Sequence, residues 1–180
     1  MKTNLNPSHK EIEVKILEVN PQEIRKKLKA LGAKQFFKGE VHAISYDYPD
    51  KRLEKSGKML RVRKAGGRIE LCFKGPNESE KFKIREEIEV LTSSFEDTIK
   101  IIESIGFKKF YERKKKRECY RLGSIKFDMD TYPGVPTYLE IEAPTTEEVA
   151  GYVKKLGYSM SQTTNMTGLQ VIHSYGEKHQ

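Results

Sequence analysis

The sequence predicts an α+β domain built on an antiparallel sheet, with helices packed on one side of the strands. Three amphipathic helix patterns, each bounded by a capping residue and a glycine, are the first observation. About eight segments of alternating polarity, mostly in hairpin order, are the second. The third is a repeat, because the strings EIEV, EIEV and EIEA, at residues 11–14, 87–90 and 140–143, each precede one of the helix patterns.

The three helix patterns share one layout. Each opens with a side chain that can accept hydrogen bonds from free backbone amides, and each ends at a glycine that can take the left-handed exit conformation. The predicted caps are Asn20, Ser93 and Thr145, and the glycines are Gly32, Gly106 and Gly157. A shorter helix is predicted near residues 166–174. The apolar stripe of each helix needs an apolar sheet face to cover, so we expect the helices on the Ile and Val side of the strands.

The strands follow from the alternation of apolar and polar residues. Two of them flank the tight turn at Ala65–Gly67 and predict a hairpin. The predicted strands cover residues 11–19, 41–48, 59–64, 68–74, 81–90, 107–121, 124–130 and 138–142. No stretch has the composition of a linker. We therefore expect a single domain over 1–180, with a core at about 10–157, a loose N-terminus at 1–8 and a loose end to the C-terminal tail.

The composition indicates the class of partner and the cellular compartment. The 34 basic residues outnumber the 26 acidic ones, and the formal charge of +8 indicates an anionic partner. Only Cys72 and Cys119 occur, without the spacing of a disulfide framework or a thiolate metal site, which fits a reducing cytoplasm. The N-terminus lacks the apolar core of a signal peptide, and no run approaches the ~18 apolar residues of a membrane span. We therefore expect a cytoplasmic protein with no membrane partner.

Side-chain parity collects charges on the side of the strands opposite to the helices. The charged positions are Glu11, Glu13, Lys15, Arg61, Arg63, Arg68, Glu70, Lys74, Lys83, Arg85, Glu87, Glu89, Arg113, Lys115, Arg117, Lys126, Asp128, Asp130, Glu140 and Glu142. On an open sheet they would form a solvated surface with ion pairs of small value. In a closed barrel they would converge on a narrow interior, at a cost that water, metal and an anionic ligand would have to offset. The density of full charges favours the closed barrel.

The two signs of charge suit different parts of one substrate. Carboxylates are hard oxygen ligands that suit Mg²⁺ or Mn²⁺, and they concentrate at Glu11, Glu13, Asp128, Glu140 and Glu142. Arginine and lysine bind phosphate oxygens, and they concentrate at Lys15, Arg61, Arg63, Lys74, Arg85, Lys115 and Arg117. A triphosphate with a divalent metal would satisfy both sets.

Four ordered motifs resemble the CYTH domain of the triphosphate tunnel metalloenzymes. The motifs are E-x-E-x-K at Glu11–Lys15, L-R-V-R at Leu60–Arg63, K-x-R-x-E-x-E at Lys83–Glu89 and L-E-I-E at Leu139–Glu142. The resemblance covers roughly residues 10–156. The run IELCFKGP at Ile69–Pro76 is most similar to the class IV adenylyl cyclase branch. One departure is that Asp47 follows Tyr46, where the family often has an aspartate before this tyrosine.

The resemblance implies a closed eight-stranded tunnel in which a metal-dependent enzyme acts on a triphosphate. It implies catalytic roles for Glu11, Glu13 and Lys15. The metal, Mg²⁺ or Mn²⁺, would be held by Glu11, Glu13, Asp128, Glu140 and Glu142. The substrate would be bound by Lys15, Arg61, Arg63, Lys74, Lys83, Arg85, Lys115 and Arg117. A homodimer is the oligomeric state that the family suggests.

Two chemistries share such a site, and the sequence leaves both open. A class IV adenylyl cyclase converts ATP to cyclic AMP and pyrophosphate, whereas a phosphohydrolase attacks the terminal phosphate of inorganic, thiamine or nucleoside triphosphate. A minor alternative is a non-catalytic protein that binds polyphosphate, or nucleic acid through the basic run Arg113–Arg117. Parity assigns alternate members of that run to opposite sides of the strand, which favours the triphosphate hypothesis.

Overall fold

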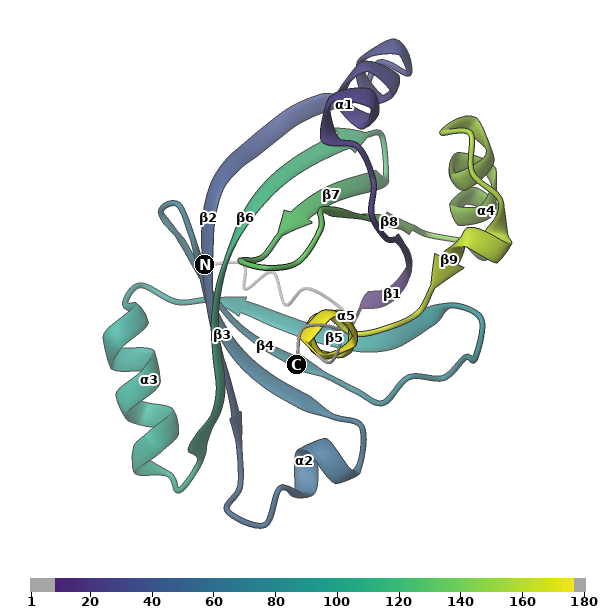
Figure 1. Ribbon diagram of the computed structural model, residues 1–180. Helices are drawn as coiled ribbons and strands as arrows, with labels where there is room; N and C mark the ends of the chain where they lie inside the picture. Colours follow the sequence, from purple (N-terminus) through teal and green to yellow (C-terminus); the bar gives the residue numbers. More distant parts are fainter. Residues whose placement is uncertain (1–8, 177–180) are drawn as a thin grey trace. The chain divides into compact units, whose positions relative to one another are not determined.

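The chain is an α+β protein whose antiparallel strands close into a barrel with helices outside it (Figure 1). The computed structural model describes residues 9–176, so the predicted loose segments at 1–8 and 177–180 lie outside the described residues. The strands are β1 His9–Ile16, β2 Lys34–Asp47, β3 Met59–Ala65, β4 Arg68–Lys74, β5 Lys83–Leu91, β6 Lys108–Leu122, β7 Ile125–Thr131, β8 Tyr138–Ala143 and the two-residue β9 Thr163–Thr164. The α-helices are α1 Pro21–Ala30, α2 Arg52–Lys55, α3 Phe95–Ser104, α4 Thr146–Lys155 and α5 Gly168–Gly176.

The ring of strands follows chain order closely. Hydrogen bonds link the strands in the order β5-β4-β3-β2-β6-β7-β8-β1, and β5 also pairs with β1, which closes the ring. Short β9 pairs with β1 at Lys15 and Ile16. A closed ring removes the exposed edge that an open sheet presents. The predicted fold class, a closed antiparallel barrel of eight main strands with helices outside, is confirmed.

Two compact units divide the described residues between them. The first unit contains Glu40–Glu78 and Arg85–Lys114, and therefore holds β3, β4, α2 and α3. The second unit contains Glu11–Gly39, Ser79–Ile84 and the chain from Lys115 onward, and therefore holds β7, β8, β9, α1, α4 and α5. Strands β1, β2, β5 and β6 contribute residues to both units, and the share of β1 in the first unit is His9 and Lys10.

In the second unit, α1 and α4 bury their apolar stripes on the sheet. The largest core cluster contains Val14, Ile16, Ile24, Leu28, Phe127, Leu139, Ile141, Val149, Val153 and Leu156. Its strand members alternate with the charged positions, as parity predicts. A smaller cluster joins Val171 and Tyr175 of α5 to Val135 and Tyr138. The apolar side of β1, β7 and β8 is therefore the side that these helices cover.

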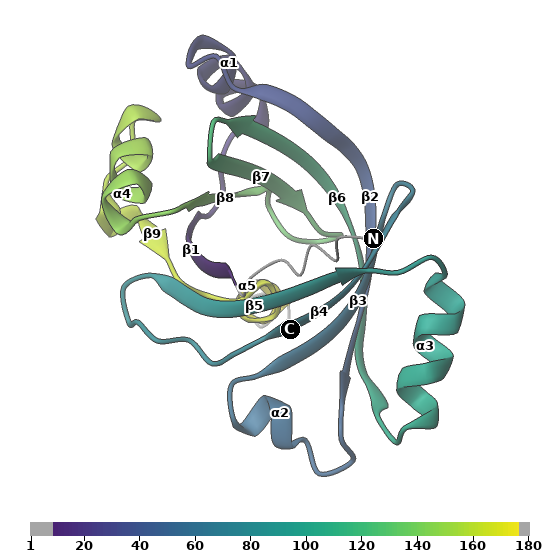
Figure 2. The same cartoon turned by 180° about the vertical axis from the view of Figure 1, so that it is seen from behind.

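In the first unit, α3 covers the corresponding apolar side. Phe95 and Ile102 of α3 are buried with Ile44, Tyr46 and Val62 of β2 and β3. Figure 2 shows α3 beside β3. This arrangement leaves the charged side of β3 and β4 facing away from the helix, because successive side chains of a strand point to opposite faces.

Two of the three predicted helix caps are confirmed and one is wrong. Asn20 accepts hydrogen bonds from the backbone amides of Gln22 and Glu23, and Thr145 accepts one from Glu148. The cap of α3 is Ser94, which accepts from the amide of Asp97, and not Ser93. Burial of Phe95 as the first helical residue sets this register. The three predicted glycines all take positive φ at the helix exits.

Several boundaries differ from the prediction. Strand β1 ends at Ile16 and not at residue 19, because Glu18 adopts a left-handed conformation with φ 56°. Strand β2 begins at Lys34, seven residues before the predicted start, in a segment that is mostly exposed and so lacks clear alternation. Helix α5 covers 168–176 in place of 166–174. Among the described residues, no helix has both the length and the apolar character needed to cross a membrane.

Candidate functional site

The charged side of the second unit carries an acid-rich cluster. We define it as Glu11, Glu13, Lys15, Lys83, Lys115, Arg117, Lys126, Asp128, Asp130, Glu140 and Glu142. Strand register brings its members together, because Lys15 on β1 lies opposite Glu140 on β8, and Asp128 on β7 lies opposite Glu140 from the other side. Arg117 on β6 lies opposite Asp130. Four neighbouring strands, β6, β7, β8 and β1, therefore supply all members of the cluster except Lys83, which comes from β5, the strand that also pairs with β1.

Lys15 is the buried centre of one half of this cluster. Its side chain is 0% exposed, and Nζ lies 2.6 Å from Oε1 of Glu13 and 3.1 Å from Oε1 of Glu140. The same Glu13 oxygen accepts a second bond of 2.5 Å from Nζ of Lys83. Burial opposes the charge of Lys15, but Glu13 and Glu140 outweigh it and raise the pKa of Lys15 above its ordinary value. The E-x-E-x-K motif thus holds a charged lysine inside the protein.

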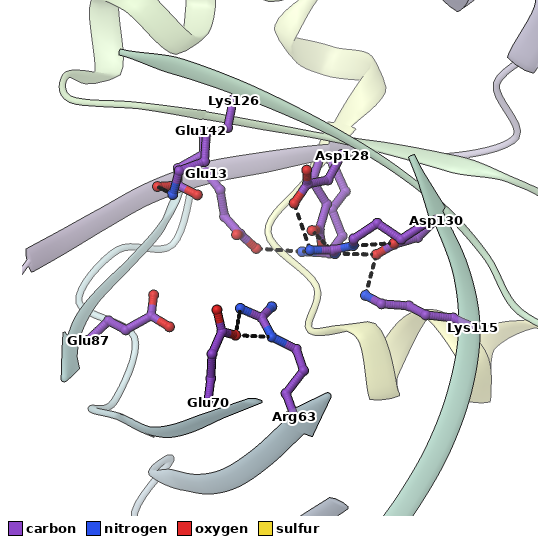
Figure 3. Close-up of polar contacts among 12 residues, drawn as sticks. Glu13, Arg63, Glu70, Glu87, Lys115, Lys126, Asp128, Asp130 and Glu142 are labelled. Carbon is purple, nitrogen blue, oxygen red and sulfur yellow. Dashed lines mark hydrogen bonds and ion pairs between the residues drawn. The ribbon is translucent and has the colours of Figure 1, made fainter. Parts of the chain in front are cut away.

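Arg117 is the centre of the other half, and Figure 3 shows its partners Asp128 and Asp130. Its NH1 nitrogen donates to Asp128 at 2.6 Å, and its NH2 nitrogen donates to Glu140 at 2.6 Å. Its Nε and NH2 nitrogens donate to the two oxygens of Asp130 at 2.6 and 2.5 Å. Lys115 adds a bond of 2.5 Å from Nζ to Oδ2 of Asp130. One guanidinium therefore binds three carboxylates through four hydrogen bonds, using most of the five donors of an arginine.

Glu142 differs from the other carboxylates of the acid-rich cluster. It accepts a bond of 2.8 Å from Lys126, an amine that remains partly exposed. Burial raises the pKa of Glu142 to about 7, Lys126 opposes the rise, and the nearby charges of Glu11 and Glu13 add to it. Glu142, Glu11 and Glu13 therefore place three carboxylates in one buried neighbourhood, which a divalent cation would stabilise.

Asp128 offers a further oxygen to such a cation. Its Oδ2 accepts from Arg117, whereas its Oδ1 is buried and has no hydrogen-bond partner within residues 9–176. A buried carboxylate oxygen without a donor is costly unless a ligand or water satisfies it. The residues present therefore fit a divalent metal by both charge and donor type.

The charged side of the first unit carries an arginine-rich cluster. We define it as Arg61, Arg63, Arg68, Glu70, Cys72, Lys74, Arg85, Glu87 and Glu89. Arg63 and Arg68 both bind Glu70, and they also contact Glu89 at 3.4 and 2.8 Å. The register of β3, β4 and β5 places these side chains in neighbouring rows. The sequence-predicted phosphate-binding residues of this unit therefore lie in one cluster, of which Figure 3 shows Arg63 beside Glu70.

Cys72 and Glu87 form a second contact in the arginine-rich cluster. The buried Cys72 thiol donates to Oε1 of Glu87 at 2.9 Å, and Lys74 lies 3.3 Å from Oε2. Burial opposes the charge of Glu87, but Lys74 and Arg61 lower its pKa to about 2. Ligand atoms of Cys72, Glu87 and Glu89 lie within 4.8 Å of one another and could hold a metal ion. Burial raises the pKa of Cys72 to about 12, so this thiol is protonated and a poor ligand in this state.

The structure gathers the predicted site residues of each unit into that unit's cluster. In the second unit these are Glu11, Glu13, Lys15, Lys83, Lys115, Arg117, Asp128, Glu140 and Glu142. In the first unit these are Arg61, Arg63, Lys74 and Arg85. Sequence reasoning did not select Asp130, Glu70, Glu87 and Glu89 as site residues, although parity placed all four on the charged side. Strand register, which shows which carboxylate meets which cation, was the missing information.

The basic run on β6 divides as parity predicts. Lys115 and Arg117 lie in the acid-rich cluster, whereas Lys114 and Lys116 are exposed. Arg113 stacks on Tyr111, with its guanidinium carbon 3.6 Å from the ring centroid. Asp47, at the position that departs from the family pattern, accepts from the backbone amides of Tyr48, Leu53 and Glu54 and so caps the unpredicted α2. It is a structural residue and lies outside both clusters.

Comparison with known proteins supports this interpretation of the fold. A protein of Methanocaldococcus jannaschii, provisionally named an adenylate cyclase, is 30% identical over 132 residues, which cover 73% of this chain and 75% of that protein. A solved structure from Vibrio parahaemolyticus, also provisionally named an adenylate cyclase, superposes with a TM-score of 0.83 at 17% identity and covers 92% of this chain and 99% of its own.

A plant protein has the same fold. The Hippeastrum structure, described as an adenylyl cyclase candidate with a dominant triphosphatase activity, has a TM-score of 0.62 at 19% identity and covers 91% of this chain and 95% of its own. The family model of the CYTH domain matches residues 9–167. The chain therefore belongs to the CYTH domain family.

Proposed function

We propose that this chain is a divalent-metal-dependent enzyme that acts on a triphosphate, as a class IV adenylyl cyclase-like lyase that converts ATP to cyclic AMP and pyrophosphate. The observation that carries the proposal is the acid-rich cluster, in which buried Lys15 and Arg117 are each shared between carboxylates. Buried charges are costly unless they are compensated, and they are retained where function needs them.

Each side chain has a role in this proposal. Glu11, Glu13, Asp128, Glu140 and Glu142 would hold Mg²⁺ or Mn²⁺, which supplies charge neutralisation at the phosphate oxygens. Lys15, Lys115 and Arg117 now donate to carboxylates, and on substrate binding they would donate to phosphate oxygens. Lys83 would bind substrate alongside Lys15, since both amines contact the same Glu13 oxygen. Donors held in place before the reaction lower the cost of stabilising the developing charge.

The first unit carries the other substrate-binding residues expected from the sequence. Arg61, Arg63, Lys74 and Arg85 provide three guanidinium forks and one amine, which suit a polyphosphate. Arg63 and Lys74 would exchange a carboxylate for a phosphate oxygen, as Lys15 and Arg117 would. The Glu87 carboxylate is ionised by its cationic neighbours, and this leaves it available as an additional metal ligand beyond those expected from the sequence.

A phosphohydrolase is the second candidate. The description of the Hippeastrum protein, which has a similar fold and a dominant triphosphatase activity, favours it. Both reactions need the same cations and carboxylates, so the charged clusters support both equally. Product identity separates them, because the cyclase expels pyrophosphate from the α-phosphorus and the hydrolase releases orthophosphate.

The experiment is a substrate panel with product analysis. Purified protein is incubated with ATP, GTP, thiamine triphosphate or inorganic triphosphate and with Mg²⁺ or Mn²⁺, and cyclic nucleotide, pyrophosphate and phosphate are measured together. Cyclic AMP with equal pyrophosphate supports the lyase, and phosphate release supports the second candidate. No turnover with any substrate and either metal contradicts both.

Variants of the acid-rich cluster tie any activity to the site. E13Q and K15M are expected to lower the rate at least ~100-fold, since both remove charge at the centre of the cluster. E118Q is the matched control, because Glu118 lies on the same barrel strand as Arg117 but binds Arg25 of α1 on the helix side. Unchanged rates in E13Q and K15M would refute the site assignment.

We also propose a cytoplasmic location and a homodimer. The location is supported by Cys72 and Cys119, which are both free and buried. The dimer is an expectation from the family resemblance alone. Light scattering of the purified protein measures the mass directly, and a monomer at micromolar concentration would contradict the dimer.

A further inference from the structure

Asp130 is a carboxylate whose hydrogen-bonding capacity is taken up by two cations. It lies on β7, is 0% exposed, and is paired in the sheet with Arg117 on one side and Tyr138 on the other. Its Oδ1 accepts from Nε of Arg117 at 2.6 Å, and its Oδ2 accepts from NH2 of Arg117 and Nζ of Lys115, both at 2.5 Å. Asp130 therefore receives a bidentate fork from an arginine together with a bond from a lysine.

Asp128, two residues earlier on the same side of β7, provides the contrast. It receives one bond from Arg117, and its second oxygen is buried with no partner among residues 9–176. A carboxylate oxygen without a hydrogen-bond partner can coordinate a metal without losing an existing bond. Asp128 has such an oxygen, whereas a metal on Asp130 would have to displace Arg117 or Lys115 from short, charge-assisted bonds.

The geometry of the Asp130 contacts fixes two flexible side chains. A bidentate pair sets the plane of the Arg117 guanidinium, which leaves its NH1 edge toward Asp128 and shares NH2 with Glu140. Lys115 has a four-carbon stem, and the bond to Asp130 restricts where its ammonium can lie. Burial and the charge of Arg117 lower the pKa of Lys115, and Asp130 acts against that fall. Arg117 and Lys115 lower the pKa of Asp130 in turn, against the effect of burial.

We infer that Asp130 is a positioning residue that orients Lys115 and Arg117 toward the triphosphate, and that it is not a ligand of the metal. This inference rests on the proposed function, because it assumes that the two cations meet phosphate oxygens. Residues that orient such groups are commonly as important to binding as the groups themselves.

The test separates anion binding from metal binding. D130N keeps the size of the side chain and removes its charge, and D128N makes the same change two residues away on the same face. Calorimetry with inorganic triphosphate in EDTA measures the cations alone, and a separate titration with Mn²⁺ measures the carboxylates alone. We expect D130N to weaken triphosphate binding by roughly 10–100-fold and to leave Mn²⁺ affinity unchanged. D128N should weaken Mn²⁺ binding and leave triphosphate binding unchanged.

A second substitution of the same residue, D130E, tests the inference with the charge retained. D130E keeps the charge but shifts both oxygens by one methylene. It should therefore weaken triphosphate binding less than D130N does and leave Mn²⁺ affinity unchanged. If D130N does not fold, D130E replaces it in both titrations. A fall in Mn²⁺ affinity in D130N or D130E, or triphosphate binding equal to wild type in both, overturns the inference. Wild-type protein that binds no triphosphate overturns the proposed function and the inference with it.

Discussion

The acid-rich and arginine-rich clusters use the same kinds of ion pair at different depths. In the acid-rich cluster, Lys15 and Asp130 are both 0% exposed. In the arginine-rich cluster, the side chain of Arg68 is 57% exposed, although its partner Glu70 is buried. Water can compensate a charge that loses its partner in the second case but not in the first. Depth, and not the number of ion pairs, therefore decides how much each pair contributes to stability.

The largest expected effect is the removal of a partner from the deepest lysine. E13Q removes the negative charge that Lys15 and Lys83 share and keeps only a neutral amide acceptor, so we expect the free energy of unfolding to fall by about 3–5 kcal/mol. Urea unfolding followed by circular dichroism measures the change. A loss under about 1 kcal/mol would mean that water reaches Lys15, and the contrast in depth would be wrong.

The second prediction concerns pH and has opposite signs in the two clusters. The raised pKa of Glu142 means that its carboxyl contributes stability below its ordinary pKa of 4.5 and loses that contribution as pH rises through about 7. The lowered pKa of Glu87 means that its carboxylate contributes stability above 4.5 and loses it as pH falls through about 2. Each contribution is on the order of 3 kcal/mol, because each pKa lies about 2.5 away from its ordinary value of 4.5.

The measurement is unfolding in EDTA as a function of pH. The free energy of unfolding of E142Q, relative to that of the wild type, should increase as pH rises from 5 to 8. E87Q should cost more stability at pH 6 than at pH 3. Parallel pH profiles for the two variants would show that the clusters do not differ in this way.

The third prediction tests the shallower cluster. E70Q weakens the contacts of Arg63 and Arg68, but both arginines keep Glu89 and Arg68 remains largely in water. We expect a loss of about 1–2 kcal/mol in the free energy of unfolding, below that of E13Q. Equal losses in E13Q and E70Q, measured under the same conditions, would remove the distinction drawn from burial.

The smallest expected effect is the loss of a helix cap, which can be compared between the two units. S94A removes the cap of α3 in the first unit, and T145A removes the cap of α4 in the second. Each should cost about 1 kcal/mol, since each side chain satisfies one free amide. S93A is the control, because Ser93 does not cap the helix. A larger loss in S93A than in S94A would contradict the observed helix start.

Much of the fold followed from local sequence, but the helix starts show the limit. The caps at Asn20 and Thr145 are confirmed: Asn20 directly precedes Pro21, a residue favoured at the first helical position, and Thr145 stands three residues before Glu148, the spacing of a capping box. Ser93 and Ser94 are adjacent and chemically equivalent, so only the burial of Phe95 decides between them. The early start of β2 could not be predicted from the sequence either. The first residues of this strand lack alternating polarity, and pairing with β6 makes the segment a strand.

The sequence by itself determined the alternation that separates an apolar side from a charged side on the strands, and the order of motifs that identifies the CYTH family. Both are properties of spacing along the chain, which strand and helix periodicity translate directly into faces. Only the tertiary structure decided which carboxylate binds which cation. Asp128 and Asp130 share a face and a residue type, and they differ because Lys115 and both edges of Arg117 reach Asp130 while one oxygen of Asp128 has no partner among residues 9–176. That difference comes from strand register, which places residues distant in sequence side by side.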